Sequence, residues 1–301
     1  MDDPRIEIHR SFYYPKRDLM RRLGVHTSIA GGLYLSLERA HALGCSTMQI
    51  FSHNPRGWYE KPISEEETSL FRSLRVRLDI SPVYIHSSYL INMASGDAAL
   101  RKKSIKLLSI ELDRADEIGA DYVILHTGSA SGDDGRIARQ RAVSALREVA
   151  LNRSRKAGLL LENTAGKKGD ISGGLQEMSE IMNALPASFI SGVCVDTCHA
   201  FASGYDIRTG AGIRRISDEL VRYIGADRVK LIHLNDSKGD VGSHLDRHEH
   251  IGRGKIGARG LRLFADHPLL RAVPLILETP KKKESDDPEN LAKVRKMIKA
   301  E

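Results

Sequence analysis

Eight short apolar segments alternate with longer segments of helical periodicity, and this alternation restricts the fold more than any other feature. Each apolar segment is about four to six residues long, which is typical of strands buried on both faces of a parallel sheet. We expect these strands at residues 23–26, 47–51, 82–86, 122–126, 159–162, 192–196, 229–234 and 274–279.

The segments between the expected strands carry helix signals. Ser64 and Glu67 fit a capping box, and Asp97 and Gly119 fit the two ends of a longer helix. Asp287, which is followed by proline, is the expected N-cap of the last helix. Eight strands that alternate with helices favour an α/β fold of the closed (β/α)8 TIM-barrel type over an open doubly wound sheet. The glycines of HTSIAGG lack the spacing of a dinucleotide-binding loop, which also disfavours the open sheet.

Length and composition fit one barrel domain. Of 301 residues 41% are apolar, and no low-complexity linker interrupts the alternation. We expect an N-terminal extension at 1–22 and a single domain at 23–301. Three cysteines, Cys45, Cys194 and Cys198, give no disulfide framework, and we expect the latter two to be small buried residues. With neither a secretory signal nor an apolar run that could span a membrane, the expected location is cytoplasmic, with nucleoid-associated activity in a prokaryote.

The ends of the strands carry the chemistry. Six consecutive expected strands carry an imidazole or carboxylate group at their last or next-to-last position, although Asp and Glu number only 39 and His 12 in the chain. The carboxyl ends of barrel strands converge on one face, where active sites lie. A cluster of carboxylates there would repel itself unless cations were present. These six candidate ligands are His86, His126, Glu162, Asp196, His233 and Glu278.

Two local motifs enlarge this cluster. His199 follows Asp196 across a turn, and Asp246 and His248 have the i, i+2 spacing that points both side chains the same way in an extended segment. The resulting nine candidate ligands are too many for one ion and suit two or three. Mixed imidazole and carboxylate ligands favour Zn²⁺, with Mn²⁺ or Fe²⁺ possible at one position.

The charge of the chain points to a reaction. A formal charge of +7 and a pI of about 9.3 favour polyanionic partners. Several divalent ions can activate water and stabilise a leaving alkoxide, so phosphodiester hydrolysis is the simplest reaction for such a site. Glu162 or Glu278 could also assist proton transfer, and the sequence does not choose between them. The alternatives are a metal-dependent sugar isomerase or epimerase of the same fold and a non-enzymatic nucleic-acid-binding barrel.

Longer motifs resemble those of the endonuclease IV family, the zinc-dependent AP endonucleases of family 2. They cover roughly residues 23–300 and include HTSIAGG, FSHNPRGW, HSSYLINMAS, LENTAG, GVCVDTCHAFASGYDI, HLNDSKG, DRHEHIGRGKIG and LETP. The resemblance implies a monomeric DNA-repair enzyme that acts on double-stranded DNA. It implies cleavage of the phosphodiester 5′ to an abasic site, which leaves a 3′-hydroxyl and a 5′-deoxyribose phosphate.

The same resemblance implies a distribution of ligands over three zinc ions. His86, His126 and Glu162 would hold the first. Glu162 would bridge to the second, which Asp196, His233 and Glu278 would also bind. The third would lie between His199, Asp246 and His248. Ser87 and Thr127 depart from the family pattern, in which an acidic residue and a proline are usual, but neither departure removes a ligand.

Residues for DNA contact come from two sources. By resemblance, Arg56, Tyr89 and Leu90 would insert into DNA and extrude the abasic nucleotide. From the residues themselves, Arg253 and Lys255 in the glycine-rich segment GRGKIG are candidates for phosphate contacts. Near the ends of the first two strands, His26 and His53 are candidates for supporting the ligands.

Overall fold

The computed structural model describes residues 21–58, 61–130, 132–151 and 155–298. In this part of the chain, eight parallel strands form one sheet in the order β1-β10-β7-β6-β5-β4-β3-β2. All eight expected strands are confirmed. They are β1 (Leu23–Val25), β2 (Met48–Ile50), β3 (Val83–His86), β4 (Tyr122–Leu125), β5 (Gly158–Glu162), β6 (Ile190–Asp196), β7 (Val229–His233) and β10 (Leu275–Leu277).

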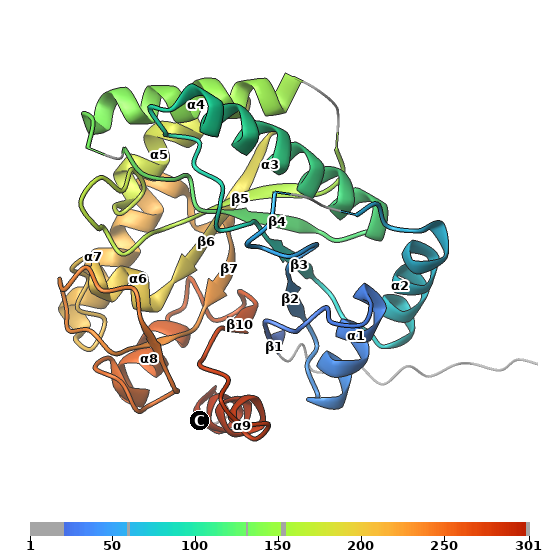
Figure 1. The fold of residues 1–301 in the computed structure, drawn as a ribbon. Coiled ribbons are helices and arrows are strands. Elements are labelled where there is room, and N and C mark those ends of the chain that lie inside the picture. Colours follow the sequence, from blue (N-terminus) through green and yellow to red (C-terminus); the bar gives the residue numbers. More distant parts are fainter. Residues whose placement is uncertain (1–20, 59–60, 131, 152–154, 299–301) are drawn as a thin grey trace, which may run out of the picture.

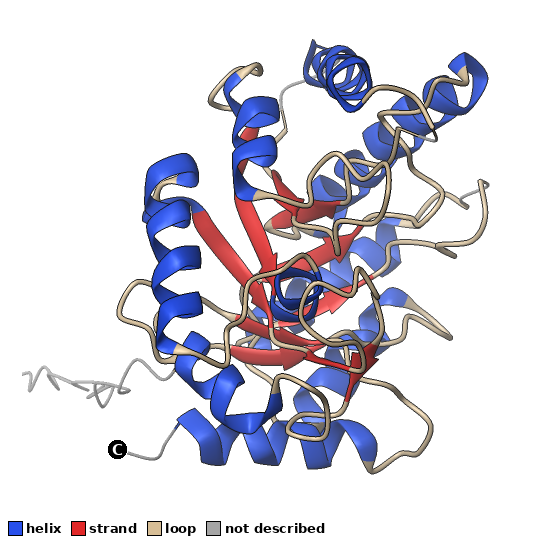
Figure 2. Ribbon diagram, turned by 90° about the vertical axis from the view of Figure 1, so that its left-hand side faces the viewer, coloured by secondary structure: helices blue, strands red, loops and turns tan. Residues whose placement is uncertain are grey.

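Helices surround these strands on the outside, as Figures 1 and 2 show. A two-residue antiparallel ribbon of β8 (Asp236–Ser237) and β9 (His248–Glu249) follows β7, and a π-helical turn (Leu220–Ile224) extends α7. The helices are α1 (Leu33–Ala42), α2 (Glu65–Arg77), α3 (Ala98–Ile118), α4 (Gly135–Leu151), α5 (Leu175–Asn183), α6 (Thr197–Ala202), α7 (Gly210–Glu219), α8 (Gly257–Ala265) and α9 (Asp286–Ile298).

The ring of strands closes between β1 and β2. β1 pairs with β10 along its length, and on its other side the backbone N–H of Thr27 donates to the carbonyl of Gln49 at 2.8 Å. Gly24 lies at this seam, where a β-carbon would stand 1.9 Å from the carbonyl oxygen of Thr47. Closure therefore requires glycine at this position, and the expected TIM barrel is confirmed.

The hydrophobic core has two layers. Most buried side chains lie between the strands and the helices, and a smaller group fills the inside of the barrel. All three cysteines are buried and unpaired, which confirms the expectation for Cys194 and Cys198. The inner group consists of Tyr84, Ile124, Leu160, Cys194, Leu231 and Ile276.

Helix ends were predicted with mixed success. Asp97 caps α3 through two backbone N–H groups, and Gly119 follows the helix with φ 73°, as expected. Ser64 caps α2, but the predicted capping box is wrong in its second half, because the Glu67 carboxylate accepts from the N–H of Leu33 at 2.5 Å and caps α1 instead.

The last helix begins earlier than expected. α9 starts at Asp286, so the prediction of Asp287 as its N-cap is wrong. The Asp286 carboxylate accepts from the backbone N–H groups of Lys282 and Lys283 at 2.7 and 2.8 Å, which orders the preceding turn and moves the helix start.

Residues 1–20 of the expected N-terminal extension lie outside the described residues. In the first described residue, Arg21, the guanidinium donates to the carbonyls of Ala265, Leu270 and Val273 at 2.6–2.8 Å. Among the helices that the structure describes, none is long and apolar enough to cross a membrane.

Candidate metal centre

The carboxyl ends of six strands place the predicted ligands together. His86, Glu162, Asp196 and His233 are the last residues of β3, β5, β6 and β7. His126 directly follows β4, and Glu278 directly follows β10. Because parallel strands end on the same face of a barrel, these side chains converge there. Together with His199 and His248 they form groups whose ligand atoms lie within 4.8 Å of one another.

Glu162 lies at the middle of this cluster and is fully buried. Its Oε2 atom is 3.3 Å from Nε2 of His86 and 3.5 Å from Nε2 of His126. Its Oε1 atom is 3.0 Å from Nδ1 of His233 and 3.4 Å from Nδ1 of His199. One carboxylate thus faces two separate sets of imidazoles, which is the geometry expected of a bridging ligand.

A second group surrounds His233. Its Nδ1 atom lies 3.2 Å from Oε2 of Glu278 and 4.0 Å from Oδ2 of Asp196. With Glu162, these residues form a group of one imidazole and three carboxylates.

A third group lies above α6. The Asp196 carboxylate accepts from the backbone N–H of His199 at 2.7 Å, and this cap turns the chain so that the imidazole returns to the centre. His199 Nε2 is 3.2 Å from Oδ1 of Asp246, and His248 Nε2 is 3.9 Å from the same oxygen and 3.6 Å from Oδ2 of Asp196. All nine predicted ligands therefore lie in one cluster, and Asp196 is shared between the second and third groups.

The spacing of these atoms fits metal ligands. Two ligands about 2.0–2.1 Å from one tetrahedral zinc ion stand roughly 3.3–3.4 Å apart, close to the 3.3 and 3.5 Å from Glu162 Oε2 to His86 and His126. Two buried atoms of the cluster, Glu162 Oε2 and His248 Nε2, also have no hydrogen-bond partner among the described residues. Such orphaned polar atoms are costly unless an ion satisfies them.

Hydrogen bonds to the other ring nitrogen orient the imidazoles. Nδ1 of His86, His199 and His248 lies 2.8–3.0 Å from the backbone carbonyls of Ser87, Asn163 and Glu278, respectively. A carbonyl can only accept, so Nδ1 carries the proton and Nε2 presents a lone pair. His233 is reversed: its Nε2 bonds to the amide of Gln49 at 2.7 Å, and its Nδ1 faces the carboxylates.

The electrostatics reflect this crowding. Burial alone would raise the pKa of Glu162, but the imidazoles of His126 and His233 hold it well below its ordinary value. Burial also opposes ionisation of Glu278, yet His233 lowers its pKa to about 2. Burial disfavours the charged form of His233, but the neighbouring Cys194, Glu278 and Glu162 raise its pKa well above the usual range. These shifts favour ionised Glu162 and Glu278 and a protonated His233.

A groove of about 970 Å³ opens above the cluster. The predicted DNA-contact residues Tyr89 and Leu90 line it, and Tyr89 is 65% exposed. Sequence reasoning missed further groove residues, namely Trp58, Asn92, Lys167, Lys238 and Arg247. They lie on the loops after β2, β3, β5 and β8, so only the fold brings them together.

The other predicted DNA contacts lie outside the lining of this groove. Arg56 is exposed on the loop after β2, and its N–H donates to the Asn54 side chain. The Arg253 guanidinium lies 3.5 Å from a carboxylate oxygen of Glu289, and Lys255 is likewise absent from the groove lining.

The supporting histidines occupy different places. His26 Nδ1 lies 2.9 Å from the Gln49 amide, and burial lowers the pKa of His26 to about 3, so its ring is neutral. His53 Nε2 lies 2.8 Å from Glu111, whose same oxygen accepts from the N–H of Ser88. This buried carboxylate thereby ties the loop that carries Arg56 to the loop that carries Tyr89.

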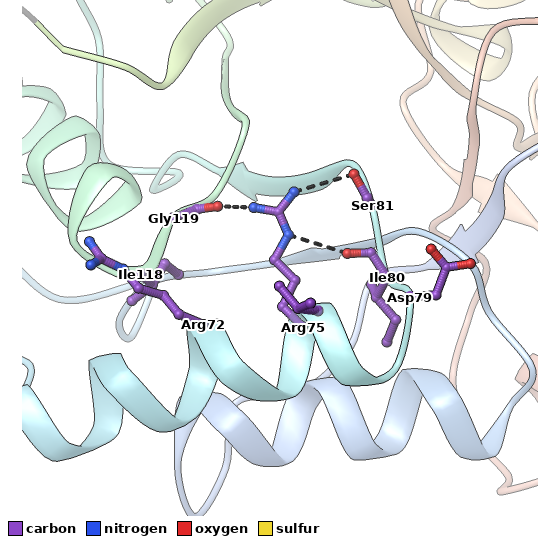
Figure 3. A pocket seen from close by; sticks show the side chains of 8 residues that line it. Arg72, Arg75, Asp79, Ile80, Ser81, Ile118 and Gly119 are labelled. Atoms are coloured by element: carbon purple, nitrogen blue, oxygen red, sulfur yellow. Dashed lines mark hydrogen bonds between the residues drawn. The ribbon is translucent and has the colours of Figure 1, made fainter. Parts of the chain in front are cut away.

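A second pocket of about 360 Å³ lies beside the segments that lead into β3 and β4, at the opposite end of the barrel (Figure 3). The Arg75 side chain crosses it and donates to the carbonyls of Ile80 and Gly119 and to Ser81 Oγ. Asp79 is the sole carboxylate among its eight lining residues, and none is an imidazole. It does not offer the ligand set of the groove.

The chain resembles a family of known proteins over most of its length. A family described as "Xylose isomerase-like TIM barrel" matches residues 37–301. A protein named "Probable endonuclease 4" from Methanosphaerula palustris is 41% identical over 283 residues, which cover 92% of this chain and 98% of that protein. Another of the same name from Halothermothrix orenii is 43% identical over 260 residues, or 86% and 94% of the two chains.

Solved structures agree with these matches. The endonuclease IV from Thermus thermophilus superposes with a TM-score of 0.81 at 37% identity and covers 93% of this chain and 100% of its own. A 3-keto-D-glucoside 4-epimerase from E. coli reaches 0.66 at 12% identity, with 93% and 100% coverage, and shows the fold alone. The chain therefore belongs to the endonuclease 4 family of xylose isomerase-like TIM-barrel proteins.

Proposed function

We propose that this protein is a DNA-repair endonuclease that hydrolyses the phosphodiester 5′ to an abasic site in double-stranded DNA. The products would be a 3′-hydroxyl and a 5′-deoxyribose phosphate, and the enzyme would act as a monomer with three zinc ions. The main support is the cluster of nine imidazole and carboxylate side chains beneath one open groove. Membership of the endonuclease 4 family adds to it.

The distances support three ligand sets. His86, His126 and Glu162 would hold the first ion, and Glu162 would share the second with Asp196, His233 and Glu278. His199, Asp246 and His248 would hold the third, with Asp196 beside them. Zinc ions bound there would supply an activated water and positive charge for the phosphate and the leaving oxygen.

The two carboxylates proposed to act in catalysis differ in access. Glu162 is fully buried and faces four imidazoles, so its role would be to bridge and to orient. Glu278 lines the groove, and its side chain is 18% exposed. A group that exchanges a proton with the attacking water or the leaving group must reach the reacting atoms. We therefore assign proton transfer to Glu278.

The rim of the groove would bind the damaged DNA. Tyr89 and Leu90 project from the loop after β3, where they can fill the space left by a missing base, and Arg56 would enter from the loop after β2. Lys167, Lys238 and Arg247 line the groove and would contact phosphates. Arg253 and Lys255, outside the lining, would contact only flanking DNA.

A sugar isomerase or epimerase is the competing function. The group of Glu162, Asp196, His233 and Glu278 alone could hold one ion for such chemistry. It leaves five of the nine converging side chains without a role. The likeness to the E. coli epimerase extends to the fold and carries no argument about substrate.

Nicking of duplex DNA that contains a tetrahydrofuran abasic analogue tests the proposal. This analogue cannot undergo β-elimination, so a cut with a 3′-hydroxyl requires hydrolysis. Glu278→Gln and Asp246→Asn should abolish cleavage and keep the fold, as followed by circular dichroism. Intact DNA with zinc-loaded wild-type protein, or wild-type rates in either variant, would contradict the proposed activity or the proposed roles.

A further inference from the structure

Gln49 is a polar residue in the middle of β2, between Met48 and Ile50, and it is fully buried. An amide in this position costs free energy unless its donors and acceptor are satisfied. Its side chain lies among residues of the metal cluster, although β2 supplies no ligand to that cluster. Sequence reasoning assigned no role to this residue.

The Gln49 amide contacts two ligands of the same group. Its Oε1 atom lies 2.7 Å from Nε2 of His233, and its Nε2 atom lies 2.6 Å from Oε1 of Glu278. The same Nε2 lies 2.9 Å from Nδ1 of His26, a neutral ring that can accept. Both donors and the acceptor of the amide are thus engaged.

The direction of this amide is determined by its partners. An ionised carboxylate can only accept a hydrogen bond, so the NH₂ group must face Glu278 and the carbonyl must face His233. The carbonyl accepts, so Nε2 of His233 must carry a proton. In the neutral ring Nδ1 then presents a lone pair toward Glu162 Oε1 at 3.0 Å and Glu278 Oε2 at 3.2 Å.

A nitrogen that faces two carboxylate oxygens at this range needs a proton or a metal ion between them, and bound zinc would take the place of the proton. We propose that Gln49 is a positioning residue for the metal group of Glu162, Asp196, His233 and Glu278. It fixes the ring tautomer of His233 and leaves Oε2 of Glu278 to face the ion. This inference rests on the proposed metal centre. The inference adds a residue that binds no metal itself but influences how tightly one ligand group binds its ion.

The neighbouring residue Thr47 provides a matched control. It precedes Gln49 by two positions on the same segment and is also fully buried, and its hydroxyl donates to the carbonyl of Pro82. Thr47→Val removes a hydrogen bond directly before β2 without touching a ligand. Gln49→Met keeps the length of the side chain and removes its polar atoms, and Gln49→Leu serves as a second variant in case one of them fails to fold.

The experiment measures zinc binding by the full chain. Metal-free wild-type protein and the three variants are titrated with zinc against a competing chelator, and the melting temperature of each metal-free form is recorded. Loss of such a supporting hydrogen bond weakens metal binding by about 10–100-fold. We expect this loss for one class of ion in Gln49→Met and Gln49→Leu, with the remaining ions bound as in wild type. Thr47→Val should lower the melting temperature and leave all zinc affinities unchanged.

The outcomes separate the two proposals. Gln49 variants that bind every ion with wild-type affinity would overturn the positioning role, as would an equal loss in Thr47→Val. Wild-type protein that binds no zinc would overturn the metal centre and this inference with it. Protein that binds zinc in the expected pattern but leaves abasic DNA intact would overturn the proposed reaction alone.

Discussion

Zinc should stabilise this protein in proportion to the number of ions it binds. Each ion that binds only the folded chain stabilises it by RT ln(1 + [Zn]/Kd), so each tenfold rise in free zinc above Kd adds about 1.4 kcal/mol per ion. The three ligand groups therefore predict about 4 kcal/mol per tenfold rise, against about 1.4 kcal/mol for a single ion. For a domain of this size, 1 kcal/mol shifts Tm by about 2 °C.

The assay is thermal unfolding in zinc buffers that span several tenfold steps of free metal. Three ions predict a rise in Tm of about 8 °C per step, and one ion predicts about 3 °C. Glu162 belongs to two of the groups, so Glu162→Gln should reduce the slope to about that of one ion. A wild-type slope of about 3 °C would refute the three-ion centre. An unchanged slope in Glu162→Gln would refute the bridging role.

Three further predictions follow from the site and the groove. The apparent affinity for zinc should increase with pH, because the raised pKa of His233 means that zinc displaces a proton. Competition titrations at pH 6, 7 and 8 measure this, and equal affinities would disprove it. Tyr89→Ala should weaken binding of abasic duplex by about 1–3 kcal/mol at unchanged zinc content, and wild-type binding would remove its role. Lys238→Ala should lower the slope of the logarithm of DNA affinity against the logarithm of salt concentration by about one. Arg253→Ala should change this slope less, and the reverse order would contradict the placement of DNA in the groove.

The ligands could be predicted well from the sequence because most of them are tied to a strand end. A strand such as β5 is visible as an apolar run, and the residue that ends it, Glu162, must lie on the catalytic face of a barrel. The same reasoning reached His199 and His248 through local turns and extended spacing. For these ligands, the local sequence pattern and the barrel fold both place the side chain at the same end of the barrel.

Other parts of the site were not predictable in this way. Lys167, Lys238 and Trp58 lie on separate loops, and their meeting in one groove depends on loop paths that no periodicity encodes. Gln49 did leave a signal, since it is a polar residue inside an apolar strand, and such a residue must find partners when buried. The second half of the Ser64 capping box failed because Glu67 found a tertiary partner in α1.

The order in which the ligands occur along the chain has a consequence for synthesis. They extend from His86 to Glu278, and the last of them follows β10, the strand that joins β7 to β1 and completes the ring. A nascent chain or a fragment that stops before β10 lacks both Glu278 and the strand that lies between β7 and β1. The nine proposed ligands can therefore come together only after β10 is inserted into the sheet.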